Sequence, residues 1–331
     1  MNMKRINLIM GIAALLFLAF GCFYIFRNYL TKDKTPPVIT ASQDTIECSI
    51  NATNDELCEG LTASDNRDGD LTSQIMVNTI QVKEDTDTTN KEFNISYIVF
   101  DSASNMTTYT RTLVYTDYTS PRFSISSPLR FTSFSDVSEN LQDYLTVYDC
   151  IEEDLSSQIT LELSEEYQNA AGSGSFECHA SVTNLMGDTS KIPIVIEVYL
   201  DEADSAILRP TIYLTNYIVY LKKGDSFDPE EYLETVTINK QNYTFLDGKK
   251  SDYIIQDSFS EYDTDIDPEK YLTPFNDGYV SADSVQCMFK NSVSIDSNVD
   301  TSIPDDYIVS YSIKDHTNEQ VGNANLIVVV E

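Results

Sequence analysis

The sequence predicts an all-β protein in which one apolar helix is followed by tandem two-sheet sandwiches. Three observations predict this class: a 21-residue apolar run near the N-terminus, period-two alternation along most of the remaining chain, and a fourteen-residue phrase written twice, 84 positions apart. Alternation of apolar and polar side chains is typical of strands with one buried face. Helical patterns are scarce after the apolar run.

The apolar run covers residues 6–26 and is interrupted only by Asn7. It is long enough to cross a bilayer as a helix. It exceeds the apolar region of about 7–15 residues found in cleavable secretory signals. We therefore expect a retained transmembrane signal anchor, with residues 1–5 as a cytoplasmic tip and residues 27–34 as a linker. The alternatives are a removed signal peptide and a lipoprotein processing site at "AFGC", residues 19–22.

The basic residues on both sides of the run do not decide its orientation, whereas the cysteines favour one side. Cys48 and Cys58 lie close together in the sequence, and Cys150 and Cys178 fall within one repeat. This spacing suits disulfides in an oxidising compartment, and the alternative is buried, reduced thiols. We expect a single-pass protein of the cell membrane with the bulk of its chain extracellular.

The net charge is −32, from 53 acidic and 21 basic residues. So acidic a chain repels phosphate backbones, which argues against nucleic-acid binding. Solubility in an anionic envelope is the plain interpretation of the charge, and weak cation uptake is the alternative.

The repeated phrase reads "TASDNRDGDLTSQI" at 62–75 and "TVYDCIEEDLSSQI" at 146–159, with seven identical positions. The openings "TPPVIT" and "TSPRFS" are also 84 positions apart, and "RPTIYL" begins a third copy. The predicted domains are residues 35–117, 118–201 and 202–331. The third domain contains an acidic, proline-bearing and loop-like insertion around 240–300, which we interpret as an elaboration on the sandwich or a small subdomain.

Each unit alternates in the way that strands do. The clearest strand patterns are at 94–100, 111–115, 192–198, 307–314 and 325–330. About 84 residues with turn signals every 8–12 residues is the size and rhythm of a two-sheet sandwich.

The first unit, "TPPVIT…ASDNRDGDLTSQI…FNISYIVFDSASNMTTYTRTLVY", resembles the bacterial immunoglobulin-like repeat family of Gram-positive surface proteins, also seen on pesticidal crystal proteins. It has the Pro-Pro-Val-Ile opening, the Asp-rich turn and the closing hairpin typical of that family. The second unit replaces Asn66 by Cys150 and Gly69 by Glu153, and the third keeps mainly the closing hairpin. The resemblance implies tandem immunoglobulin-like β-sandwiches and no particular activity.

Oxygen-bearing side chains are concentrated in the first copy of the phrase and on its closing hairpin. They are Asp65, Asn66, Asp68, Asp70, Asp101 and Asn105. Calcium takes six to eight such oxygen ligands, so a calcium site is one interpretation. The other is a tight turn in which these side chains accept backbone N–H groups and Gly69 has a positive φ. Loss of the glycine in the second unit favours the turn.

Catalytic motifs are absent from the sequence: we find no nucleophile elbow, no phosphate-binding loop and no zinc-ligand spacing. His179 and His316 fall in different units, and the adjacent Glu152 and Glu153 are expected to point apart. Cys287 has no partner in its unit and is expected to be a free thiol. We therefore predict that the protein is not an enzyme and binds no cofactor other than calcium.

The functional prediction is a non-catalytic, membrane-anchored cell-surface protein for adhesion, ligand binding or spacing. Its ligand would be a surface protein or a polysaccharide, contacted through the insertion of the third unit because long loops on rigid scaffolds often carry function. The alternative is an accessory or assembly subunit of a membrane or envelope complex.

Overall fold

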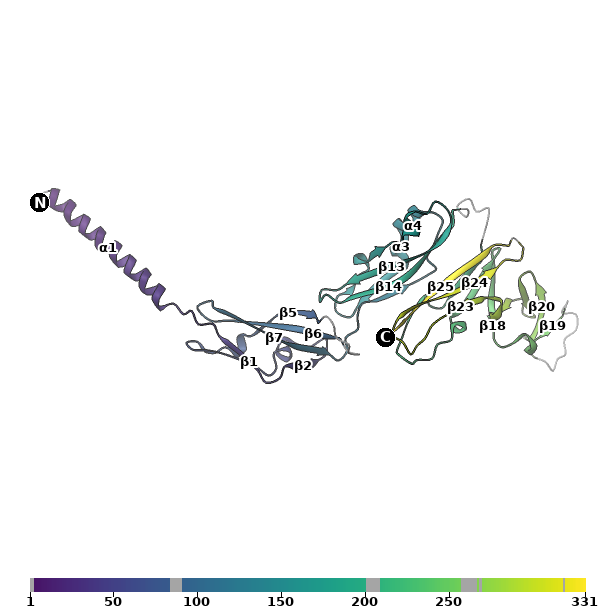
Figure 1. Ribbon diagram of the computed structural model, residues 1–331, viewed down its shortest axis with the longest axis horizontal. Coiled ribbons are helices and arrows are strands. Elements are labelled where there is room, and N and C mark those ends of the chain that lie inside the picture. Colours follow the sequence, from purple (N-terminus) through teal and green to yellow (C-terminus); the bar gives the residue numbers. More distant parts are fainter. Residues whose placement is uncertain (1–2, 84–90, 201–208, 257–266, 268–269, 318) are drawn as a thin grey trace. The chain divides into compact units, whose positions relative to one another are not determined.

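The computed structural model describes residues 3–83, 91–200, 209–256, 267, 270–317 and 319–331. After one long N-terminal helix, most of the regular structure of the chain is β-strand, as the sequence predicts (Figure 1). Its contacts divide it into two compact units, Met1–Tyr118 and Thr119–Glu331. The domain boundary predicted at residue 202 lies outside the described residues.

Helix α1 (Met3–Thr31) contains the apolar run. Its segment Met10–Arg27 has a mean hydropathy of 1.9, and none of it is buried against the rest of the protein. Among the described helices it alone is long and apolar enough to cross a membrane, a test that a signal sequence also passes. Leu16, Phe17 and Phe20 are among the apolar side chains left exposed. A helix exposing such residues all round requires an apolar surrounding.

The remainder of the first unit is a sandwich of two sheets, with strand orders β1-β3-β4 and β2-β7-β6-β5. Its strands are β1 (Val38–Ala41), β2 (Thr45–Cys48), β3 (Leu61–Asp65), β4 (Gly69–Asp70), β5 (Met76–Val82), β6 (Glu92–Phe100) and β7 (Met106–Tyr115), with the short helices α2 (Asn54–Leu57) and η1 (Thr72–Gln74) between them. Strands β6 and β7 form the predicted closing hairpin. Alternate residues of β6, from Phe93 to Val99, are fully buried and form the core.

The second sandwich opens the Thr119–Glu331 unit, with sheets β11-β10-β8 and β12-β13-β14-β9. Its strands are β8 (Arg122–Ile125), β9 (Arg130–Phe131), β10 (Leu145–Asp149), β11 (Glu153–Asp154), β12 (Thr160–Glu162), β13 (Gly174–Thr183) and β14 (Thr189–Val198), with the helices α3 (Phe134–Tyr144), η2 (Ser156–Gln158) and α4 (Glu165–Gln168). Helix α3 was not predicted from the sequence. Ser133 caps this helix by accepting the N–H of Asp136, and Val137 and Leu141 bury its inner face.

The third sandwich pairs a seven-stranded sheet, β15-β17-β18-β22-β21-β20-β19, with a four-stranded sheet, β16-β25-β24-β23. Its strands are β15 (Thr211–Leu214), β16 (Ile218–Leu221), β17 (Leu233–Ile238), β18 (Gln241–Leu246), β19 (Ile254–Ile255), β20 (Tyr271–Phe275), β21 (Gly278–Ser281), β22 (Gln286–Phe289), β23 (Ser294–Asp296), β24 (Asp306–Lys314) and β25 (Val321–Val330), with the helical turns η4 (Pro229–Tyr232), η5 (Lys250–Asp252) and η7 (Lys290–Ser292).

The described part of the insertion contains the strands β18 to β23, and the prediction of a loop is wrong for β20 and β21. Strands β20 and β21 form a hairpin there that extends the larger sheet. Leu272 and Cys287 are buried with Phe289 in a small core of their own, which gives these strands an inner face. The acidic residues 257–266 of the insertion lie outside the described residues.

The second and third sandwiches share one hydrophobic core that runs from Phe123 to Val330. The Tyr220 hydroxyl accepts the backbone N–H of Phe123 over 2.7 Å. Arg122 pairs with the Glu331 carboxylate, with 2.6 Å between Nη2 and Oε2. Strands β14 and β25 contact each other across this junction. Residues 119–331 thus fold as one unit instead of as two independent modules.

Candidate functional site

Three acidic side chains converge in the first unit. Asp33, Asp65 and Asp101 each offer one carboxylate oxygen, and these oxygens all lie within 4.8 Å of one another. Asp33 belongs to the linker that follows α1, Asp65 ends β3, and Asp101 follows β6. Asp33 and Asp101 are only 8% and 7% exposed. The sequence predicted Asp65 and Asp101 as cation ligands and missed Asp33.

Backbone groups hold one oxygen of each carboxylate in this acidic cluster. Oδ1 of Asp33 accepts the N–H of Thr35 over 3.0 Å, and Oδ1 of Asp101 accepts the N–H of Asn105 over 2.7 Å. The amides of Asp68 and Arg67 donate to Oδ1 of Asp65. These two hydrogen bonds hold the pKa of Asp65 below its ordinary value. Asp65 is therefore a carboxylate at neutral pH.

The second oxygens of two of these carboxylates have few donors. In the part of the chain that the structure describes, Oδ2 of Asp33 and Oδ2 of Asp65 are buried and receive no hydrogen bond. Nε of Arg67 lies 3.2 Å from Oδ2 of Asp33, on a side chain that is 57% exposed. One exposed guanidinium thus stands against three carboxylates. Burying charge without compensation is costly.

The linker lies against the closing hairpin at this cluster. The Asn105 amide donates to Oδ2 of Asp101 over 2.6 Å and lies 3.3 Å from the backbone oxygen of Asp33. The Thr107 hydroxyl donates to the backbone oxygen of Pro37 over 2.5 Å. These bonds connect residues about 70 positions apart and fasten the linker to the sandwich.

The other predicted cation ligands hold loops together. Asp68 accepts two hydrogen bonds from Ser102, each 2.8 Å long. Asp70 accepts the N–H two residues further on, and the Asn66 amide donates to the Thr35 hydroxyl over 3.5 Å. Of the six candidates, the structure brings Asp65 and Asp101 into the acidic cluster, with the Asn105 amide bound to Asp101. The tight-turn interpretation describes the remaining three.

The corresponding places in the other two sandwiches combine a carboxylate with an amide. In the second sandwich the Asn184 amide donates to Oδ2 of Asp149 over 3.0 Å. In the third, the Asn239 amide donates to Oδ2 of Asp315 over 2.8 Å. Asp149 and Asp315 are fully buried. Among the described residues, the first of the three places is where three carboxylates each offer an oxygen within 4.8 Å of the others.

The predicted disulfides are not formed, because all six cysteines are free thiols. Cys178 lies on β13, where its Sγ is 3.9 Å from the Ser164 hydroxyl, whereas Sγ of Cys150 donates to the backbone oxygen of Thr119 over 3.2 Å. The two thiols thus have separate partners, one in the core and one at a turn. The spacing of cysteines in a sequence does not show in which direction each thiol points.

Cys48 and Cys58 also form no disulfide. Sγ of Cys58 lies 3.9 Å from the backbone oxygen of Ile75, and Cys48 lies on the edge strand β2. Burial raises the pKa of both thiols above the ordinary value. Both are therefore protonated at neutral pH. Cys287 is a buried free thiol, as predicted.

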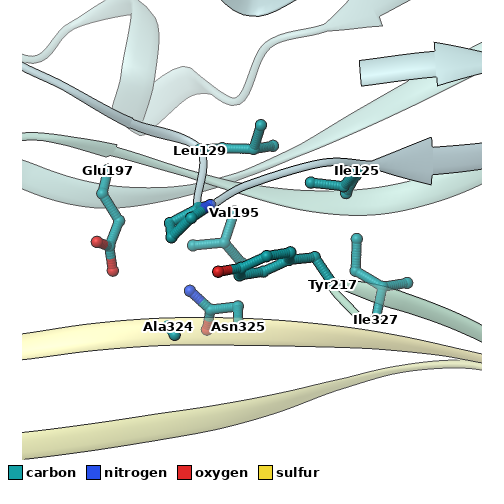
Figure 2. Close-up of a pocket in the computed structure, with 9 residues that line it drawn as sticks. Ile125, Leu129, Val195, Glu197, Tyr217, Ala324, Asn325 and Ile327 are labelled. Carbon is teal, nitrogen blue, oxygen red and sulfur yellow. The ribbon is translucent and has the colours of Figure 1, made fainter. Parts of the chain in front are cut away.

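A small cavity lies at the junction of the second and third sandwiches (Figure 2). The Tyr217 hydroxyl, the Asn325 amide and the Glu197 carboxylate surround it, together with apolar side chains such as Val195. Its volume is about 20 Å³. That space holds one water molecule and no organic ligand. The cavity is a feature of packing and no binding site.

A larger cleft of about 700 Å³ lies on the extended sheet of the third sandwich. Its lining includes the apolar side chains of Leu246 and Phe289 and three lysines, Lys249, Lys250 and Lys290. Two acidic residues also line it. Bases therefore outnumber acids in this cleft, whereas acids outnumber bases 53 to 21 in the whole chain.

Comparisons with known proteins suggest no family. No family model matches the sequence, and no curated protein matches it. A structure of carbohydrate-binding module CBM51-2 with GlcNAc and INT domains from Clostridium perfringens ZmpB is 15% identical, with a TM-score of 0.19, over 49% of this chain and 41% of that chain. This chain thus spans less than half the length of that structure.

Two other solved structures show similarly low likeness. The lipoprotein BT2262 from Bacteroides thetaiotaomicron is 14% identical over 49% of this chain and 99% of its own, with a TM-score of 0.17. The protocadherin GammaB4 extracellular domain is 11% identical over 90% of this chain and 50% of its own, with a TM-score of 0.15. Values this low carry no functional argument.

Proposed function

We propose that the protein is a non-catalytic, membrane-anchored surface protein whose sandwiches present a binding or spacing surface outside the cell. The observation that carries the proposal is helix α1, an unburied apolar segment of spanning length that leads within a few residues into successive two-sheet domains. The resemblance of the first unit to bacterial immunoglobulin-like surface repeats supports the extracellular side. The proposal includes no catalytic step.

Protease treatment of intact cells tests the location. Protease added to whole cells should remove the domains after residue 34 and leave α1 with the membrane, because α1 is the spanning segment. Full protection in intact cells, with digestion only after lysis, would place the domains inside and contradict the proposal.

For ligand contact we propose the cleft on the extended sheet of the third sandwich. Its lysines and its two apolar side chains combine charge with apolar surface, a mixture common in ligand sites. An anionic surface polymer or acidic protein segment suits this lining. The experiment compares retention of full-length protein on envelope polysaccharide and protein fractions before and after Lys249→Ser with Lys250→Ser.

The matched control is Lys222→Ser with Lys223→Ser, an exposed lysine pair elsewhere in the same sandwich. If the cleft is the contact site, only the first pair of substitutions weakens retention. Equal loss with both pairs would mean that general charge, and not the cleft, governs retention.

An accessory subunit that docks to a membrane complex is the second proposal, and one exposed patch favours it. Met76, Phe100 and Met106 lie on neighbouring strands of the first sandwich and are 52%, 40% and 56% exposed. Exposed apolar side chains gathered on one face mark interaction surfaces more often than isolated ones do. Replacing all three by serine should reduce co-purification of membrane partners if docking is the function, and should leave ligand retention unchanged.

A further inference from the structure

We propose that the acidic cluster of Asp33, Asp65 and Asp101 binds one calcium ion and that this ion locks the linker after α1 onto the first sandwich. The proposal deepens the proposed function, because a locked linker would make the anchored domain a rigid projection from the membrane. Each step rests on the geometry of the first unit.

The charges of the cluster call for a cation. Three carboxylate oxygens lie within 4.8 Å of one another, and like charges at that distance repel strongly where water is excluded. Oδ2 of Asp33 and Oδ2 of Asp65 are buried and receive no hydrogen bond from the described residues. Arg67 supplies one positive charge from an exposed position. A divalent ion would balance the remaining charge.

Oxygen ligands at this spacing match calcium. Calcium binds oxygen at about 2.3–2.6 Å, so two ligands of one ion lie at most about 5 Å apart. The observed limit of 4.8 Å satisfies that geometry. Carboxylates suit hard cations and not zinc or copper, and calcium tolerates irregular surroundings completed by water better than magnesium does.

The other sandwiches show what the same position looks like without an ion. There an amide, Asn184 or Asn239, donates directly to the buried carboxylate. In the second sandwich Asn184 stands at the start of the hairpin turn, the place that Asp101 occupies in the first. The amide proton replaces the positive charge. The first sandwich, with a carboxylate at this place, has no such donor to Oδ2 of Asp65.

The ion would connect three segments that are distant in sequence: the linker, the end of β3 and the turn after β6. Asp33 belongs to no strand and reaches the sandwich through hydrogen bonds near the hairpin. A bound ion adds ligand bonds at this point, and its binding to the closed arrangement alone would stabilise it. Opening of the linker then requires release of the ion.

Linker opening can be measured by trypsin, which cuts after Lys32 and Lys34. Full-length protein is placed in nanodiscs of uncharged lipid, and cleavage there is followed in about 5 mM calcium, in about 5 mM magnesium and in chelator. The exposed Lys222 and Lys223 provide an internal reference in the same chain. We expect calcium to slow linker cleavage about fivefold or more relative to the reference, with a smaller effect of magnesium.

Calcium binding is measured by equilibrium dialysis as the difference between wild type and variants, because the acidic surface also binds calcium weakly. Asp33→Asn and Asp101→Asn should each lose one ion per chain and the calcium effect on cleavage. Asp70→Asn, which removes an acid of the same loop outside the acidic cluster, should keep both. Because Asp101→Asn reproduces the arrangement of the second sandwich, it should remain folded.

Equal cleavage of wild type in calcium and chelator, or equal binding by wild type and Asp33→Asn, would overturn the proposal. If Asp101→Asn does not fold, Asp33→Asn decides, since residue 33 belongs to no strand. Retention of the protein on envelope fractions is a separate readout. A failed calcium effect with intact retention contradicts the ion alone, and the reverse contradicts the surface function alone.

Discussion

The side-chain amide of Asn184 donates a hydrogen bond to Oδ2 of Asp149 across 3.0 Å inside the second sandwich. Asp149 is fully buried, and Asn184 is 6% exposed. Oδ1 of Asp149 meanwhile accepts the backbone N–H groups of Ile151 and Glu152. Both oxygens of this buried carboxylate are therefore satisfied by neutral donors. The amide is what allows the charge to remain buried.

Replacing Asn184 by aspartate should destabilise the unit formed by residues 119–331. The variant places a second carboxylate beside Asp149 and removes the donor, which leaves an uncompensated buried charge costing about 3–5 kcal/mol. Urea unfolding at neutral pH measures the loss. Asn298→Asp makes the same chemical change at an exposed position and should have little effect. Equal effects of the two variants would contradict the role assigned to the amide.

Replacing Glu153 by glycine should stabilise the same unit. Glu153 has φ of +66°, and Gly69, at the same position of the first sandwich, has φ of +76°. A side chain in this left-handed region costs about 1–2 kcal/mol, so Glu153→Gly should raise the free energy of unfolding by about 1 kcal/mol.

The reciprocal change, Gly69→Glu, serves as the control for that prediction. A Cβ at position 69 would meet nothing within 4 Å, so the cost there is purely conformational. It should lower the urea midpoint of the first sandwich by a similar amount. A lower midpoint for Glu153→Gly would mean that its side chain contributes more than the backbone strain removes.

The core hairpins could be predicted from sequence because the alternation of apolar and polar residues that indicates a strand lies within a few neighbouring positions. Burial of Phe93, Ile95, Tyr97 and Val99 repeats the period of two that the sequence shows. Helix α3 was missed although Ser133 precedes it and Phe134, Val137, Leu141 and Tyr144 recur at helical spacing, because the helix is only eleven residues long and lies between strands. The strands in the insertion of the third unit were missed because acidic and proline residues interrupt their short apolar faces.

The acidic cluster could be predicted only in part. Asp65 and Asp101 stand at the ends of recognisable elements, and the repeat aligns them with Asp149 and Asn184. Asp33 joins them through a contact between the linker and a hairpin about 70 residues away, which no local pattern records. The disulfide prediction failed for a similar reason, since spacing does not tell which way a thiol points.

Replacing Tyr220 by phenylalanine should weaken the junction of the second and third sandwiches. The hydroxyl accepts the N–H of Phe123 over 2.7 Å, and Arg122 lies over the ring at 4.7 Å from its centre. The ring remains in the variant, so the expected loss is that of one partly buried hydrogen bond, about 1–2 kcal/mol. Thermal unfolding measures it. Tyr213→Phe, at a more exposed ring, should leave the midpoint unchanged.

Alkaline pH should destabilise the same junction. Burial raises the pKa of Tyr199, Tyr217 and Tyr220 from 10.0 to about 12. Below pH 10 both folded and unfolded chains keep these protons. Between about pH 10 and 12 the unfolded chain releases them while the folded chain retains them, so the free energy of unfolding falls as the pH rises. Above about pH 12 the contribution of these tyrosines to stability is lost.

Urea midpoints from pH 9 to pH 12, with tyrosinate absorbance as the second readout, measure this dependence. The folded unit retains three tyrosine protons that the unfolded chain releases, and this difference sets the slope of the free energy of unfolding against pH. Burial also raises the pKa of Tyr311. Tyr220→Phe should reduce the slope by one proton. A slope unaffected by Tyr220→Phe would show that this ring is solvated, and the junction would then be held by apolar contacts and by other polar contacts such as the hydrogen bond from Arg130 to the backbone oxygen of Pro210.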